Sequence, residues 1–175
     1  MTHTITPQRL TALCQINRWR GWTVRPYSVG EHCAIGAYVL EWFKRSRIEV
    51  VAFWLHDMHE TEVIGDVPRP DKARFVNAEY HAAVDLFDAH LGNAAGLSRG
   101  WQSDKALKRM DMLMMRVEND IISVNRDPDL TTPDYRTDPM AEMIRECIED
   151  RTFDTPEKVV SLWDRHGMWE VIGNE

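Results

Sequence analysis

The sequence lacks the cysteine pattern of a disulfide-rich protein or of a zinc ribbon. Its three cysteines, Cys14, Cys33 and Cys147, are far apart and form no CxxC pair. This excludes a disulfide framework and favours a reducing compartment, the cytoplasm. The sequence also has no run of eighteen apolar residues, and its first residues lack the basic-then-apolar layout of a secretion signal. We therefore expect no membrane span and no export.

Patterns typical of β-strands are scarce as well, because no useful run alternates apolar and polar residues. The chain has 175 residues, 43% hydrophobic and 28% charged, which suits one globular domain with a sizeable core. We find no internal repeat and no composition typical of a domain linker. The sequence predicts one compact all-α bundle of six or seven helices that spans residues 1–175.

The net charge of −7 is unevenly distributed. Residues 1–30 contain four arginines and no acidic residue, so the other 145 residues carry 17 basic and all 28 acidic side chains. The acidic bulk argues against binding of a nucleic-acid polymer or of a membrane surface. The basic segment is compatible with a small anionic ligand, and equally with a merely basic surface.

Helix-start signals and helix breakers divide the chain. Ser28 followed by Glu31 fits a capping box, and Thr6-Pro7 and Thr155-Pro156 each fit an N-cap followed by proline. Clusters of glycine and proline predict loops at 18–27, 61–71, 92–102 and 126–139. Apolar periodicity between them predicts helices at 7–17, 29–44, 48–60, 72–91, 140–149 and 156–166, and one that begins at a Ser103 cap and runs through Ile121. In the last helical segments, Trp163 and Trp169 could form a subunit interface or close the core.

Residues 56–60 read HDMHE and directly follow the apolar run AFWL. The imidazole of His56 and the carboxylate of Asp57 suit zinc, cobalt, iron, nickel or manganese. A buried carboxylate without a partner is costly, and a metal would supply the missing positive charge. The plain alternative is a solvated helix end. His32 is a second candidate ligand, and Asp111 is another, although a salt bridge from Asp111 to Lys108 is an alternative there.

Three segments together resemble a known family. They are NRWRGW…RPYSVGEHC, WLHDMHETEVIGDVPRPDK and ALKRMDMLMMRVEND, within residues 8–125. Their order, with His32, then His56-Asp57, then Asp111, resembles the HD superfamily of metal-dependent phosphohydrolases. The similar subgroup holds bacterial 5′-deoxynucleotidases and phage dATP triphosphohydrolases. The chain beyond them is expected to add C-terminal helices over 140–175.

The resemblance implies roles for individual residues. A divalent metal (zinc, cobalt or manganese) would be held by His32, His56, Asp57 and Asp111. Catalysis would involve Glu60, which orients or activates the attacking water, and Asp66, near the scissile phosphate and the sugar. Substrate would be bound by Arg18, Trp19 and Lys72, and we add Arg69 for phosphate charge and Trp22 for base stacking. Five residues separate Glu60 from Asp66, where the family pattern has four, so either the loop absorbs one residue or Glu62 takes part of this role.

The expected function is hydrolysis of 2′-deoxynucleotides at the phosphoester next to the sugar. The compact length and the altered segment 20–25 favour a phage-type dATP triphosphohydrolase, which could recruit an additional Mg²⁺ with its triphosphate. One alternative is a 5′-deoxynucleotidase that acts on monophosphates, and another is an inactive HD-fold nucleotide sensor. The resemblance further implies a homo-oligomer, a dimer or a hexamer, in the cytoplasm of a bacterium or of a phage-infected host.

Overall fold

Helices make up the regular structure of the residues that can be described. The computed structural model describes residues 5–62, 77–131 and 133–172. The α-helices in these ranges are α1 (Pro7–Leu13), α2 (Val29–Trp42), α3 (Arg47–Leu55), α5 (Ala78–Ala94), α6 (Lys105–Ile121), α7 (Pro139–Glu149), α8 (Pro156–Arg165) and α9 (Met168–Val171). Short 3₁₀ helices join them: η1 (Arg18–Gly21), η2 (Met58–Thr61), η3 (Trp101–Ser103), η4 (Pro128–Leu130) and η5 (Pro133–Thr137). The β-pairing in the same ranges consists of two isolated bridges. The prediction of an all-α fold is confirmed.

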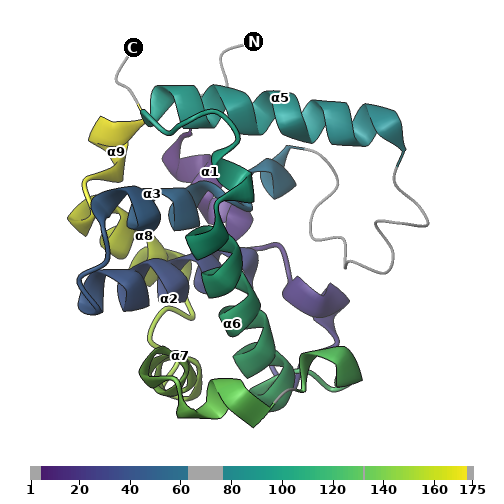
Figure 1. Cartoon of the computed structure of the whole chain (residues 1–175). Helices are drawn as coiled ribbons and strands as arrows, with labels where there is room; N and C mark the ends of the chain where they lie inside the picture. Colours follow the sequence, from purple (N-terminus) through teal and green to yellow (C-terminus); the bar gives the residue numbers. More distant parts are fainter. Residues whose placement is uncertain (1–4, 63–76, 132, 173–175) are drawn as a thin grey trace.

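Helix α2 is the central element of the bundle. Eleven of its fourteen residues are buried, and it packs against α1, α3, α6, α7 and α8. Helix α5 lies across one end of the bundle and α7 lies near the other end, with α6 running between them (Figure 1). A helix surrounded on all sides must be apolar on all sides, so a charged or polar side chain on α2 calls for a specific partner.

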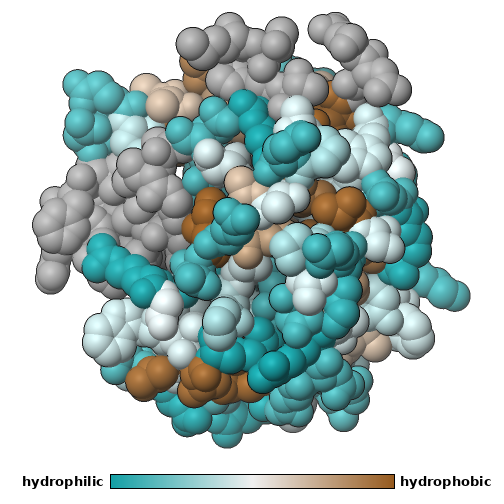
Figure 2. All heavy atoms as spheres, turned by 180° about the vertical axis from the view of Figure 1, so that it is seen from behind, coloured by the Kyte–Doolittle hydropathy of each residue, from teal (hydrophilic) through white to brown (hydrophobic). Residues whose placement is uncertain are grey.

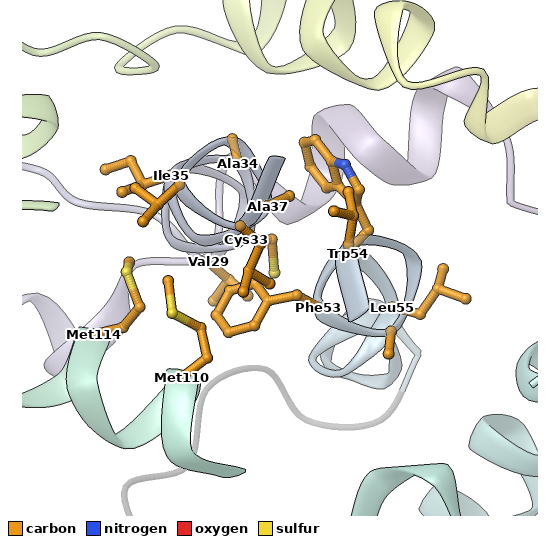
Figure 3. Packing of buried hydrophobic residues seen from close by; sticks show 14 of the residues in the cluster. Val29, Cys33, Ala34, Ile35, Ala37, Phe53, Trp54, Leu55, Met110 and Met114 are labelled. Carbon is orange, nitrogen blue, oxygen red and sulfur yellow. The ribbon is translucent and has the colours of Figure 1, made fainter. Parts of the chain in front are cut away.

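The core is built where α2, α3 and α6 meet. Figure 3 shows the ring of Phe53 extending from α3 toward α2, with Met110 and Met114 of α6 on the side of the ring that faces away from α3. From α8, Trp163 is fully buried, and its ring meets that of Trp54 edge-on with centroids 5.1 Å apart. Trp163 therefore closes the core.

Three of the predicted N-caps are present. The side chains of Thr6, Ser28 and Thr155 accept hydrogen bonds from the backbone N–H groups three residues later. The predicted capping box at Ser28 is only half formed, because the Glu31 carboxylate binds Arg25 through both oxygens, at 2.6 and 3.0 Å. A complete capping box is instead found at the start of α3.

Several predicted boundaries were wrong. Helix α1 ends at Leu13 and not near 17, because the backbone of residues 16–18 pairs with that of residues 27–29. Helix α5 continues through the predicted loop start to Ala94. At Gly92 an added Cβ would lie 2.3 Å from Nε1 of Trp101, so this glycine lets the next segment pack closely. Within the predicted loop 126–139, residues 128–130 form η4 and residues 133–137 form η5, with Leu130 and Tyr135 buried.

The surface is mainly polar on the face shown in Figure 2, where apolar groups form small separate patches. Among the described helices, none combines the length and the apolar character that crossing a bilayer requires.

Candidate metal centre

Three helices bring the predicted metal ligands together. His32 lies in the first turn of α2, His56 and Asp57 follow the last residue of α3, and Asp111 lies on α6. The Nε2 atoms of His32 and His56 are 3.3 Å apart. One ligand atom each from His32, His56 and Asp57 falls within a group whose members are all within 4.8 Å of one another. These three residues therefore form a group that could hold a metal ion, and their role as ligands stays a prediction.

The two carboxylates complete this cluster. Oδ2 of Asp57 lies 3.2 Å from Nε2 of His56 and 3.9 Å from Nε2 of His32. Oδ1 of Asp111 lies 3.7 and 3.6 Å from the same two nitrogens. Ligand atoms about 2.1 Å from a tetrahedral zinc would be roughly 3.4 Å from one another. The residues present therefore fit a divalent metal in both spacing and ligand type.

The outer nitrogens of both imidazoles are already bound. Nδ1 of His56 donates to the backbone carbonyl of Phe53 at 2.7 Å, and Nδ1 of His32 donates to Oε1 of Glu118 at 2.5 Å. A carbonyl can only accept, so Nδ1 of a neutral His56 carries the proton and Nε2 keeps its lone pair. Such outer contacts hold the ring orientation of histidine ligands in metal sites.

The cluster also shifts the pKa values of its members. Burial alone would lower the pKa of His56, but Asp57 and Asp111 outweigh it and raise this pKa well above its ordinary value of 6.5. Burial would raise the pKa of Asp57, yet His56 and Arg18 hold it well below its usual range. The same balance, with His56 as the main partner, lowers the pKa of Asp111 to about 2. Both carboxylates are therefore ionised, and a metal ion would have to displace the proton that His56 binds at Nε2.

Arg18 and Trp19, predicted to bind substrate, lie beside the cluster. Arg18 is buried and bridges two carboxylates, with Nη1 3.0 Å from Oδ2 of Asp57 and Nε 3.2 Å from Oε2 of Glu118. The indole nitrogen of Trp19 also donates to Oε2 of Glu118, at 3.2 Å. Trp22 is 57% exposed, and its backbone bonds to Val124. Arg18 therefore contacts the cluster directly, through Asp57, and Trp19 is joined to it through Glu118, whereas Trp22 lies at the surface.

Glu60 and His59 lie on η2, immediately beyond the cluster. The prediction of one helix over 48–60 was wrong, because α3 ends at Leu55 and η2 starts at Met58. Glu60 and His59 are nevertheless buried, and each offers a ligand atom in a second group with Asp57. Nδ1 of His59 lies 3.3 Å from Oδ1 of Asp88 on α5. His59 is thus an interior residue that ties η2 to α5.

The remaining predicted residues divide into two groups. Asp66, Arg69 and Lys72 lie outside the described residues. Glu62 lies at the end of the described segment, where its carboxylate binds Nη2 of Arg9 at 2.6 Å. This ion pair joins Glu62 to α1. A cavity of about 490 Å³ lies between α2, α6 and α7, and none of the predicted site residues lines it.

Sequence reasoning missed Glu118 of α6, which contacts His32, Arg18 and Trp19. Glu118 lies seven residues after Asp111, two helical turns on, and therefore on the same face. It interrupts an apolar repeat that includes Met114 and Val117. An acidic residue in a buried stripe, in register with a candidate ligand, was the available signal.

The comparisons with known proteins do not name a family. Neither the models of protein families nor the curated proteins with which we compared the chain gave a match. The geometry of the cluster is therefore the observation on which a functional conclusion has to rest.

Proposed function

We propose that the chain is a metal-dependent hydrolase of 2′-deoxynucleotides of the HD-superfamily type. The observation that carries the proposal is the convergence of two imidazole nitrogens, 3.3 Å apart, with two ionised carboxylates at 3.2–3.9 Å from them. A set of two nitrogens and two carboxylate oxygens suits zinc, manganese or cobalt, and an ion with five or six ligands would also take up water and a phosphate oxygen. Within this class we propose cleavage of dATP to deoxyadenosine and triphosphate.

A divalent metal, when bound, lowers the pKa of its water toward about 7 and polarises the phosphoryl oxygen. His32, His56, Asp57 and Asp111 would hold it. Proton transfer and substrate binding would depend on other side chains of the protein. Glu60, which is buried beside Asp57, would hold the attacking water and accept its proton.

Arg18 and Trp19 would bind the nucleotide. A guanidinium next to the cluster can balance phosphate charge through a bidentate fork, and Arg18 already lies 3.0 Å from Asp57. The ring of Trp19 offers a surface for the nucleoside. In the proposal, Lys72, Arg69 and Asp66 complete the phosphate site from their segment, and an additional Mg²⁺ accompanies a triphosphate.

Product analysis tests the proposal. The purified protein is incubated separately with dATP, dAMP, dGTP and ATP in the presence of manganese, cobalt or zinc, and the phosphate product is identified by chromatography. We expect triphosphate from dATP. Phosphate from dAMP, with no reaction of dATP, would replace the proposal with a 5′-deoxynucleotidase. Nucleotide binding without any turnover would replace it with a sensor.

Two variants test the assigned roles. Asp57→Ala should lose bound metal and activity together, because it removes a ligand. Glu60→Ala should keep its metal but lose turnover by about 10²–10⁴-fold, the usual contribution of a general base. Metal content is measured by elemental analysis after gel filtration. Full metal content in Asp57→Ala would show that the ligand assignment is wrong.

A further inference from the structure

Glu118 joins two parts of the site through its two oxygens. It is completely buried on α6. Oε1 accepts from Nδ1 of His32 at 2.5 Å and from the Tyr27 hydroxyl at 2.9 Å. Oε2 accepts from Nε of Arg18 and from Nε1 of Trp19, both at 3.2 Å. One oxygen therefore serves a candidate metal ligand, and the other serves the segment that precedes α2.

That segment has an unfavourable backbone conformation. Trp19 and Arg20 both lie in the left-handed region, with φ of 55° and 53°, which non-glycine residues rarely occupy. Such a conformation persists only where the surroundings hold it in place. The side chains of Arg18 and Trp19 stabilise this conformation, because both donate hydrogen bonds to the same oxygen of Glu118.

The charge balance around Glu118 favours a fixed orientation. The guanidinium of Arg18 supplies a positive charge 3.2 Å from Oε2 of Glu118. Four donors surround its two oxygens, which leaves a rigid and fully bonded group. Turning the carboxylate to improve one set of bonds would weaken the other set.

We propose that Glu118 is a positioning residue that couples metal binding at His32 to the conformation of the Arg18–Trp19 segment. Through Oε1 it orients the imidazole and increases its basicity, and through Oε2 it holds the segment. Coupling between two sites is reciprocal, so metal should order the segment and the ordered segment should strengthen metal binding. The inference rests on the proposed function, in which this segment contacts the nucleotide. Its test needs no nucleotide.

Metal affinity is the first measurement. Glu118→Gln keeps the size of the side chain and removes its charge, and zinc affinity is measured by competition with a chromophoric chelator. We expect a loss of about 10–100-fold, which is typical when the outer partner of a histidine ligand is removed. The matched control is Glu31→Gln, which removes another buried carboxylate, one paired with Arg25. It should leave zinc affinity unchanged.

Trypsin cleavage after the exposed Arg20 is the second measurement, since it reports the order of the segment. Zinc should slow this cleavage severalfold in the wild-type protein and should not slow it in Glu118→Gln at a saturating zinc concentration. Trp19→Phe, which keeps Glu118 but loses the indole N–H, should show faster cleavage and a severalfold weaker zinc affinity.

Several outcomes would overturn the inference. A folded Glu118→Gln protein with wild-type zinc affinity would do so, as would cleavage of the wild-type protein that zinc does not change. If Glu118→Gln fails to fold, unchanged zinc affinity in Trp19→Phe is decisive against it. Absence of nucleotide hydrolysis, with these zinc effects present, would reject the proposed function alone. A wild-type protein that binds no zinc, manganese or cobalt would reject both.

Discussion

A single glycine sets how closely two helices of the site approach. At Gly36 of α2, an added Cβ would lie 2.0 Å from Cε1 of Phe53. The Phe53 ring in turn lies 4.6 Å from the ring of His56 and 5.5 Å from that of His32, measured between centroids. The positions of both candidate histidine ligands therefore depend on the absence of a side chain at residue 36.

Gly36→Ala should destabilise the protein by about 1–3 kcal/mol, the usual cost of adding volume to a filled core. The Phe53 ring is buried and cannot turn outward to make room. The free energy of unfolding is measured by urea titration. The double variant Gly36→Ala/Phe53→Leu, which removes the clashing ring atoms, should recover part of the loss. A single variant as stable as the wild type would contradict the close approach.

At the scale of elements, one hydrogen bond both accompanies the end of α3 and orients the candidate ligand His56. In a continued helix, the carbonyl of Phe53 would accept from the backbone N–H of Asp57, four residues later. Instead it accepts from the imidazole of His56. The helix stops at Leu55, although no glycine or proline marks the stop. Because the local pattern continues through His56, this boundary was not predictable from periodicity.

The start of α6 shows a second limit of predicting helix boundaries from sequence. Ser103 and Asp104 are both good N-cap residues, and a sequence pattern cannot choose between neighbours. In the structure Asp104 is the cap, and its Oδ1 accepts from the backbone N–H groups of Ala106 and Leu107 at 2.8 and 3.1 Å. Ser103 belongs to the preceding η3. The predicted cap was therefore one residue too early.

The two positions make a matched pair of variants. Asp104→Ala should lower the free energy of unfolding by about 1 kcal/mol, because two backbone donors lose their acceptor. Ser103→Ala should change it by less than about 0.5 kcal/mol, as is usual for an exposed position without a cap. Urea unfolding of both proteins under one condition gives the comparison. A larger loss in Ser103→Ala would show that the serine is the cap.

At the scale of the molecule, the residues that could be predicted are those with a strong local signal. The all-α fold follows from helix starts and apolar periodicity. The convergence of His32, His56 and Asp57 agrees with the metal-binding pattern of their sequence segments. The contacts of Glu118 could not be predicted, because its four donors come from three segments that only the folded chain brings together. The burial of His59 against Asp88 depends in the same way on how α5 crosses the bundle.

His166 joins three helices at the C-terminal end of α8. Its Nδ1 accepts from Nε1 of Trp54 on α3 at 2.8 Å, and its Nε2 lies 3.1 Å from Oε2 of Glu41 on α2. Burial lowers the pKa of His166 below 6.5, although Glu41 opposes this shift, and Arg165 and Arg47 add to it. Protonation of Nδ1 would also break the bond from Trp54. The folded state therefore favours the neutral ring.

The lowered pKa of His166 fixes the sign of this residue's contribution to the pH dependence of stability. Because the pKa of His166 is lower in the folded chain, the unfolded chain binds more protons as pH falls below about 6.5. The contribution of His166 to the free energy of unfolding should then fall between pH 7.5 and 5.5. His166→Asn keeps an acceptor near the Nδ1 position but cannot titrate, so it should lose less stability over this range in metal-free buffer. Urea unfolding of both proteins at both pH values measures the difference, and other titrating groups, His56 included, cancel in it. An equal change in the two proteins would mean that His166 has the same pKa folded and unfolded.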